Sequence, residues 1–232
     1  MPAIQNDIVT AGDAAVRRAP RVAVAGLIFS LLFLVGWLLM RQSPTLDDSD
    51  DVLVAYYGDA DSRRNSLLAG LYVIPLASVA FIWFMAAARE RYVRSARRED
   101  TILSTAHVVA GAIVVTSLLT LATVELAVVW LAEAQTPVDV DGIRPLLALG
   151  VASSQSMALR SAAVFVGISA SRSMRSKTFP RSYGVLSMLT AIALLVAYEE
   201  ASWISLVFPL WVALTSLVIL FRRQTAIRAE DA

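Results

Sequence analysis

Three ionisable side chains stand inside long apolar stretches of the sequence, and their chemistry is the first thing to explain. They are His107, Glu125 and Arg160. A charge at the centre of a bilayer costs about 2.5 to 3.5 kcal/mol on insertion scales, so such a residue usually faces other helices and has a partner. Arginine stays protonated in proteins. Arg160 can therefore fix an anion or a carboxylate but cannot carry a proton, whereas Glu125 can titrate.

The spacing of these residues decides which of them can act together. His107 and Glu125 are separated by five helical turns, so they share a helix face but lie roughly 27 Å apart. The side chains between them on that face cannot relay a proton, so this helix alone does not encode a proton wire. We expect His107 to be an ordinary solvated histidine near the cytoplasmic interface. A short loop makes the helices of Glu125 and Arg160 antiparallel neighbours, and the sequence predicts that these two residues pair. The alternative is that Arg160 binds a ligand.

Arg160 belongs to a stretch, 145–170, that is poor in bulky side chains. Small residues recur every four positions in it, a pattern that lets membrane helices approach closely: Gly150, Ser154, Ala158 and Ala162. We predict a central helix whose small-residue ridge packs tightly against another helix. The functional alternative is that Arg160 on this helix is a binding or coupling charge.

The composition indicates a membrane protein. Hydrophobic residues make up 57% of the 232 residues and charged residues 17%, and the mean hydropathy is +0.65. Cysteine is absent and histidine occurs once, which excludes disulfides, thiolate sites and multi-histidine metal sites. No catalytic or phosphate-binding motif is present. We therefore expect no catalytic residue, no metal and no cofactor.

Six apolar segments predict an all-α integral membrane protein with a single helical bundle. Each is flanked by polar residues and most are long enough to cross a bilayer. The predicted spans are 22–40, 66–88, 102–132, 145–170, 183–198 and 203–221. Residues 1–21 would form a cytoplasmic N-terminal segment, and residues 222–232 a cytoplasmic tail. We expect no separate soluble domain.

The distribution of basic residues orients this bundle, because cytoplasmic segments of membrane proteins are enriched in Arg and Lys. With both termini cytoplasmic, the outer side holds only Arg41, Arg63, Arg64 and Arg144. The inner side then holds Arg17, Arg18, Arg21, Arg89, Arg91, Arg94, Arg97, Arg98, Arg172, Arg175, Lys177, Arg181, Arg222, Arg223 and Arg228. Every expected inner segment is basic.

An acidic run, 47–51, precedes the residues Val52 to Tyr57 on the expected outer side. Asp48 or Ser49 can cap a short helix there, with the following acids near its positive end. Val52, Ala55 and Tyr56 would share one face of it. A calcium site is the alternative, but the run lacks the glycine and terminal glutamate of an EF-hand loop.

Three parts of the sequence resemble a group of uncharacterised multi-pass membrane proteins of high-GC bacteria. They are the acidic stretch 47–57, the helix end Phe84-Met85-Ala86-Ala87-Ala88-Arg89, and Phe179-Pro180-Arg181-Ser182-Tyr183-Gly184. The resemblance covers most of the chain in layout. It implies a six-helix fold in a bacterial plasma membrane and no assigned activity.

Three classes of function are compatible with this sequence. The first is a structural or accessory subunit that binds a membrane-protein partner or a second copy of itself, which predicts a solid core with a lipid-facing groove. The second is a small transporter or channel-like protein that uses Arg160 and Glu125, which predicts a hydrated cavity beside them. The third, a lipid-modifying membrane enzyme, is the least favoured because no polar cluster converges at either interface. The bilayer is a partner in each case, and nucleic acid in none.

Overall fold

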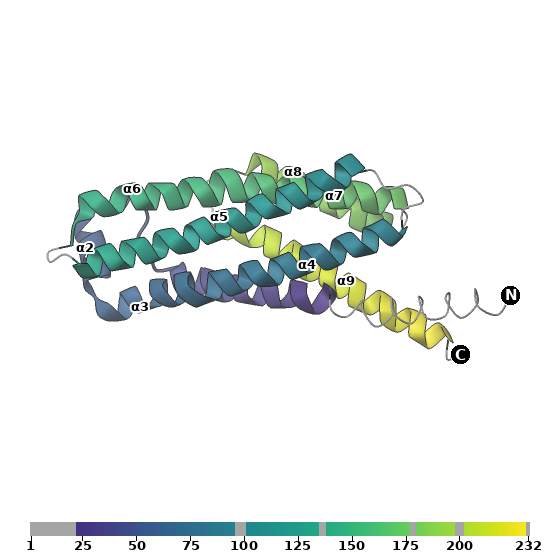
Figure 1. Ribbon diagram of the computed structural model, residues 1–232, viewed down its shortest axis with the longest axis horizontal. Helices are drawn as coiled ribbons and strands as arrows, with labels where there is room; N and C mark the ends of the chain where they lie inside the picture. The colour runs from purple at the N-terminus through teal and green to yellow at the C-terminus, as the bar shows by residue number, and fades with distance from the viewer. Residues whose placement is uncertain (1–21, 96–100, 135–137, 177–179, 198–201, 231–232) are drawn as a thin grey trace.

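The computed structural model describes residues 22–95, 101–134, 138–176, 180–197 and 202–230, and these are mostly helical with no strand among them (Figure 1). The first half of the chain forms a first helix, Val22–Met40, then α2 (Asp50–Gly58), α3 (Ala60–Leu68), η1 (Ala69–Val73) and α4 (Ile74–Ser95). The second half forms α5 (Thr101–Ala134), α6 (Val140–Val151), η2 (Ala152–Ala158), α7 (Leu159–Ser176), α8 (Arg181–Val196), η3 (Ser202–Leu206) and α9 (Val207–Glu230). The expected cytoplasmic segment 1–21 lies outside the described residues.

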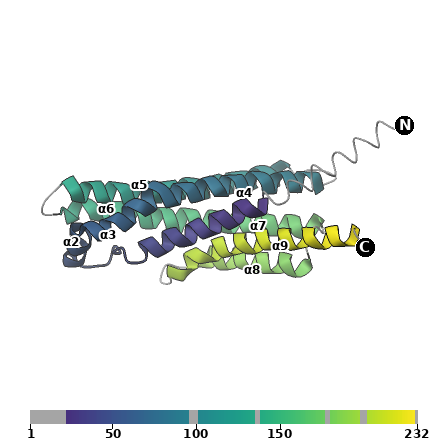
Figure 2. The same cartoon turned by 90° about the horizontal axis from the view of Figure 1, so that it is seen from below.

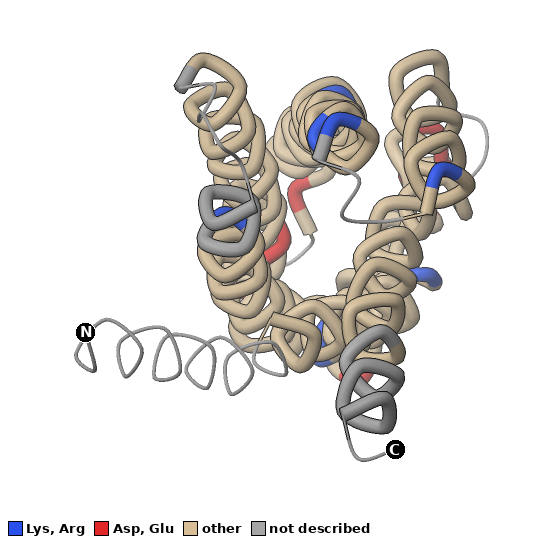
Figure 3. The backbone as a smooth tube through the Cα atoms, turned by 90° about the vertical axis from the view of Figure 1, so that its right-hand side faces the viewer, with Lys and Arg blue, Asp and Glu red and all other residues tan. Residues whose placement is uncertain are grey.

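Four helices of the described chain are long and apolar enough to cross a membrane. They are Val22–Met40, Ala60–Arg89, Ile102–Ala134 and Trp203–Phe221, which correspond to four of the six expected spans. Figure 3 looks along the bundle and shows long tan stretches of helix without a charged residue. The segment expected at 145–170 falls below this standard because its small and polar side chains lower its hydropathy. The fifth expected span, 183–198, is too short for this standard. Its helix, α8, has 16 residues and is about 24 Å long, whereas the hydrocarbon core of a bilayer is about 30 Å thick.

The long helix α5 lies between two rods that each contain a π-helical turn. One rod is α3–η1–α4 and the other is α6–η2–α7, and both contact α5 (Figures 1 and 2). Pro75 accounts for η1. It has no N–H to donate, and the N–H of Ile74 bonds the carbonyl of Ala69, five residues back, instead of that of Gly70.

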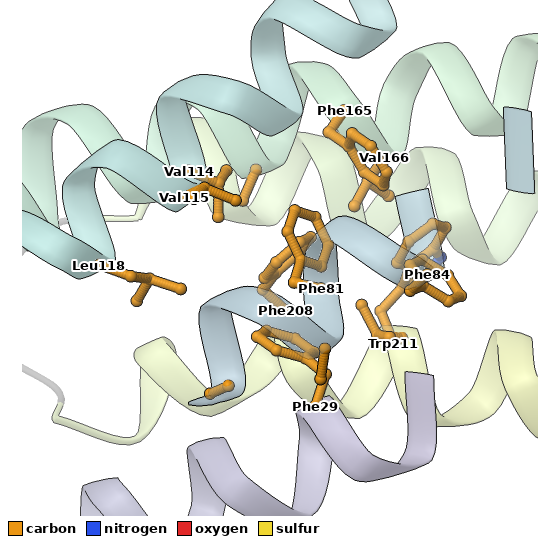
Figure 4. Close-up of a cluster of buried hydrophobic side chains, with 14 of the residues drawn as sticks. Phe29, Phe81, Phe84, Val114, Val115, Leu118, Phe165, Val166, Phe208 and Trp211 are labelled. Atoms are coloured by element: carbon orange, nitrogen blue, oxygen red, sulfur yellow. The ribbon is translucent and has the colours of Figure 1, made fainter. Parts of the chain in front are cut away.

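The largest core is rich in aromatic rings and lies where the first helix, α4, α5, α7 and α9 meet (Figure 4). Phe81 is fully buried at its centre. Its ring centroid lies 5.0 Å from that of Phe29, 5.4 Å from that of Phe165 and 5.4 Å from that of Phe208. We call the part of the molecule around this core the stem.

A second, smaller core lies beyond the stem, where α2 packs against the ends of α5 and α6. It joins Leu53 and Tyr57 of α2 to Val128 of α5 and Ile143 of α6. We call α2, α3 and the adjoining ends of α5 and α6 the cap. The start of the first helix and the end of α9 both lie at the opposite end of the molecule (Figures 1 and 2).

The structure refines one local prediction and corrects another. The short helix after the acidic run exists and begins after Ser49; it buries Leu53 and Tyr57, whereas Val52, on the face that the sequence analysis named, is 46% exposed. The reason is that α2 packs sideways onto α5 and α6 through an i, i+4 pair. The last helix does not stop at Arg222, because α9 continues to Glu230.

Candidate functional site

Arg160 is held at the end of a neighbouring helix. Its Nη1 donates to the carbonyl oxygen of Ala197 at 2.9 Å and to that of Leu194 at 3.3 Å. These carbonyls belong to the last turn of α8 and its C-cap. The final carbonyls of a helix lack partners within the helix and carry the negative end of its dipole, so a guanidinium satisfies both needs. Arg160 therefore caps α8 and fixes it against α7.

The structure does not bring Arg160 and Glu125 together. Helices α5 and α7 are antiparallel: His107 lies opposite Ser169 and Ser117 opposite Ser153. This register places Arg160 level with about residue 113 of α5, about twelve residues or roughly 18 Å from Glu125. Among the described residues, no ion pair joins the two. The two side chains do not bridge the distance between them along the helix axes, because the Arg160 side chain contacts α8 instead.

Glu125 lies at the base of the cap and is 5% exposed. Its carboxyl group interacts with the hydroxyl of Ser66, and its charge acts on Tyr57 of α2. Its Oε2 atom is buried and has no hydrogen-bond partner within the described part of the chain. Glu125 thus belongs to a polar cluster with Ser66 and Tyr57. The sequence pattern did not indicate these two partners.

His107 is fully buried, which corrects the expectation of a solvated histidine at the interface. Its ring stacks on Phe165 with centroids 4.0 Å apart, and its Nε2 lies 2.9 Å from Ser169 Oγ. Ser169 donates its only hydroxyl hydrogen to the carbonyl of Phe165, so Nε2 is the donor in the pair with Ser169. Because Phe165 and Ser169 are four residues apart on α7, they cover the imidazole together. His107 pins α5 to α7.

A cavity of about 290 Å³ lies in the stem between the first helix, α4, α5, the η2–α7 rod and the start of α9. Its lining is largely apolar and includes Phe33, Trp37 and Leu118, while Gln155 and Ser154 add polar groups. Neither Glu125 nor Arg160, as the structure places them, is part of this lining.

The small-residue ridge predicted from the sequence builds one wall of this cavity. Gly150 does pack closely, since a Cβ there would lie 3.3 Å from Val124 Cγ1 of α5. Farther along, Ser154, Ala158 and Ala162 line the cavity. Their small side chains leave room that no neighbouring helix fills. The sequence predicted the ridge of small residues, but it did not indicate whether a neighbouring helix would fill the space beside that ridge.

Two arginines that the sequence analysis used only for orientation hold the cap together. Arg144 of α6 donates to the carbonyls of Leu46 at 2.7 Å and Asp48 at 2.9 Å, and pairs with Asp50 at 2.5 Å. Arg63 of α3 donates to the carbonyl of Tyr57 at 2.6 Å. Its Nε lies 3.9 Å from Glu133. Basic residues are rare on the expected outer side, and this rarity was the only sequence feature that pointed to a structural role for Arg63 and Arg144.

No protein-family model matches this sequence, and no curated protein or solved structure matches it either. The resemblance to uncharacterised membrane proteins of high-GC bacteria therefore stays a prediction.

Proposed function

We propose that the protein is an accessory component of a bacterial plasma membrane that acts by binding and performs no chemistry itself. The observation that carries this proposal is the apolar cavity of about 290 Å³ in the stem. Pockets of about this size that are lined by apolar side chains and a few polar groups are typical of small-molecule sites. The occupant that fits best is the hydrocarbon chain of a membrane lipid.

Three features support a lipid chain as the occupant. The walls are apolar, so they offer little to an ion or a polar solute. The first helix, which forms one wall, presents Leu31, Leu34 and Leu38 outward, where a membrane protein meets lipid. Gln155 and Ser154 of η2, together with Ser205 of η3, add polar groups that can orient the polar end of a chain.

The membrane arrangement we propose has six spans, both termini in the cytoplasm and the cap outside. Four helices of sufficient length and apolarity support it, as does the strong excess of basic residues on the inner side. The α6–η2–α7 rod and α8 would provide the other two spans, and α8 presents Leu186, Leu189 and Leu195 outward. Single cysteines at Ser95 and Ser176 should resist a membrane-impermeant thiol reagent in intact cells, while one at Ser62 should react. Labelling at Ser95 or Ser176 would rule out the six-span arrangement.

The lipid proposal is tested by filling the cavity. Ala158→Leu places a larger side chain in its wall, and Ala193→Leu makes the same change at an exposed position of α8. The proteins are purified in a delipidating detergent, and retained lipid is measured by native mass spectrometry. We expect the wild-type chain and Ala193→Leu to retain a phospholipid and Ala158→Leu to lose it. Equal retention by all three would refute binding in this cavity.

A small transporter is the second candidate, and the buried carboxyl group of Glu125 is the observation that favours it. It ranks lower because the cavity does not reach Glu125 or Arg160 and because Arg160 is engaged by α8. Proteoliposomes can separate the two candidates. Solute or ion flux that Glu125→Gln abolishes and Ala158→Leu preserves would favour transport over lipid binding.

A further inference from the structure

Glu125 and Tyr57 bring two partnerless oxygen atoms to the base of the cap. Glu125 Oε2 and Tyr57 Oη are both buried, and neither has a hydrogen-bond partner among the described residues. Leaving a buried polar atom unsatisfied costs about 1 to 3 kcal/mol, more when it is charged. The two groups are electrostatic neighbours, because burial and then the charge of Glu125 raise the pKa of the Tyr57 hydroxyl. Tyr57 is therefore a neutral hydroxyl at physiological pH.

Further oxygen atoms surround this pair. The hydroxyl of Ser66, which is fully buried, interacts with the Glu125 carboxyl group. Ser66 Oγ lies 3.5 Å from Tyr56 Oη and 3.4 Å from Ser43 Oγ, and these last two lie 3.0 Å apart. Hydroxyl groups from α2 and the segment after the first helix thus converge on Ser66, and Ser66 of α3 contacts the carboxyl group of α5.

The π-helical turn η1 brings the backbone of Gly70 close to Glu125 and leaves one of its carbonyl groups short of a donor. Gly70 lets this turn approach α5 closely, since a Cβ there would lie 2.9 Å from the carbonyl of Ala122 and 3.3 Å from Glu125 Cβ. The N–H of Ile74 bonds Ala69, and Pro75 has no N–H. The carbonyl of Gly70 therefore receives no hydrogen bond from either residue that would normally supply one in a helix.

The charge of the site is that of one carboxylate. In the described part of the cap, the ion pairs join Arg63 to Glu133 and Arg144 to Asp50, and neither involves Glu125. When Glu125 is ionised, its buried negative charge beside neutral hydroxyl groups matches a ligand with one positive charge. Hard cations prefer oxygen ligands of this kind.

We propose that Glu125, with the hydroxyl groups of Tyr57 and Ser66 and the carbonyl group of Gly70, binds a monovalent cation under the cap. The bound ion supplies the partner that the two buried oxygen atoms lack and ties α2, α3 and α5 together. The cap then depends on this ion as well as on Arg63 and Arg144. The inference is independent of lipid binding in the stem, because the two sites share no residue.

The test measures thermal unfolding of the full chain in lipid nanodiscs at pH 7, with sodium chloride replaced stepwise by choline chloride at constant ionic strength. Sodium should raise the unfolding temperature in a saturable way. Glu125→Gln should abolish the response, whereas Asp61→Asn, which removes an exposed carboxylate of the same cap, should retain it. Tyr57→Phe keeps the ring but removes one oxygen ligand, and should raise the half-saturating sodium concentration about tenfold.

Three results would overturn the proposal. The first is an unfolding temperature that does not differ between sodium and choline. The second is a sodium response that persists in Glu125→Gln. The third is a dependence on pH without a dependence on sodium, which would identify Glu125 as a protonation site instead. If Glu125→Gln fails to fold, Tyr57→Phe decides, because an unchanged half-saturating concentration in that variant contradicts the ligand set.

Discussion

The stem and the cap satisfy their polar groups in different ways. In the stem, many hydroxyl groups bond back to the helix that carries them, as Ser78 does to the carbonyl of Ile74 and Ser117 to that of Ile113. Such bonds say nothing about which helices are neighbours. In the cap, Arg63 and Arg144 reach from one element to the backbone of another. The stem is thus specified by ring packing and the cap by a few charged hydrogen bonds.

A small number of cross-helix polar contacts interrupt this rule in the stem. Trp211 donates to Ser187 at 2.9 Å, and the hydroxyls of Tyr183 and Thr215 lie 2.8 Å apart. These pairs join α8 to α9, as His107 joins α5 to α7 and Arg160 joins α7 to α8. Ring packing tolerates rotation of a helix about its axis better than a hydrogen bond does, so we interpret these pairs as the contacts that fix helix rotation.

The largest effect is expected from Phe81→Ala in the stem. Phenylalanine-to-alanine changes in protein cores cost about 3 to 5 kcal/mol. Lipid is as apolar as the core, so we expect the lower end, about 3 kcal/mol. Reversible unfolding in mixed micelles measures it. Trp83→Ala, on the same helix but 67% exposed, is the control and should cost far less. Similar costs for both would mean that the aromatic core does not specify the stem.

Removing a cap arginine should have a smaller and local effect. Arg144→Met keeps the length of the side chain but loses contacts with Leu46, Asp48 and Asp50, at a cost of about 2 kcal/mol for charged hydrogen bonds. Hydrogen exchange should accelerate in α2 and leave α5 and α7 protected. Arg64→Met changes an exposed arginine of the same cap and should leave exchange in α2 unchanged. Equal acceleration throughout the stem would show that the two regions unfold as one.

Arg160→Gln should cost roughly 1 kcal/mol, because α8 loses a charged cap on its last turn. Arg160→Lys should recover part of this loss. Combined with Glu125→Gln, the two costs should add within about 0.5 kcal/mol, since the residues have separate partners in separate regions. A coupling energy well above that value would restore the direct pair that the sequence predicts.

The smallest effect concerns the turn before α2. The N–H of Thr45 and then its hydroxyl donate to Asp48 Oδ2 and hold the pKa of Asp48 below its ordinary value of 3.8. A lowered carboxyl pKa contributes stability that is complete above the ordinary value and is lost as pH falls through the lowered one. Amide exchange at Thr45, corrected for its intrinsic pH dependence, should lose protection in that range. Asp48→Asn should remove the pH dependence, and a turn equally protected at pH 3 and pH 6 would contradict it.

The sequence predicts the stem better than the cap, for physical reasons. Long apolar helices follow from composition alone, so helix Val22–Met40 and α5 were located closely. The partners of Arg160 and Glu125 depend on helix register and rotation, and hydropathy does not encode either. The cavity exists because the α6–η2–α7 rod packs closely on α5 at Gly150 but leaves space beside Ala158. Hydropathy does not encode this difference. The burial of Leu53 and Tyr57 depends on the side from which α2 docks.

The π-helical turns make the chain sensitive to its length in a way that substitutions do not reveal. Each residue of an α-helix turns the chain by about 100°, and a turn that bonds five residues back carries one extra residue. Deleting one residue within η2 would restore a regular helix but rotate everything after it. Arg160 would leave the end of α8, and Ser169 would leave His107. Single-residue deletions in η2 should therefore be far more damaging than any substitution there, and a second-site insertion farther along α7 would not repair them.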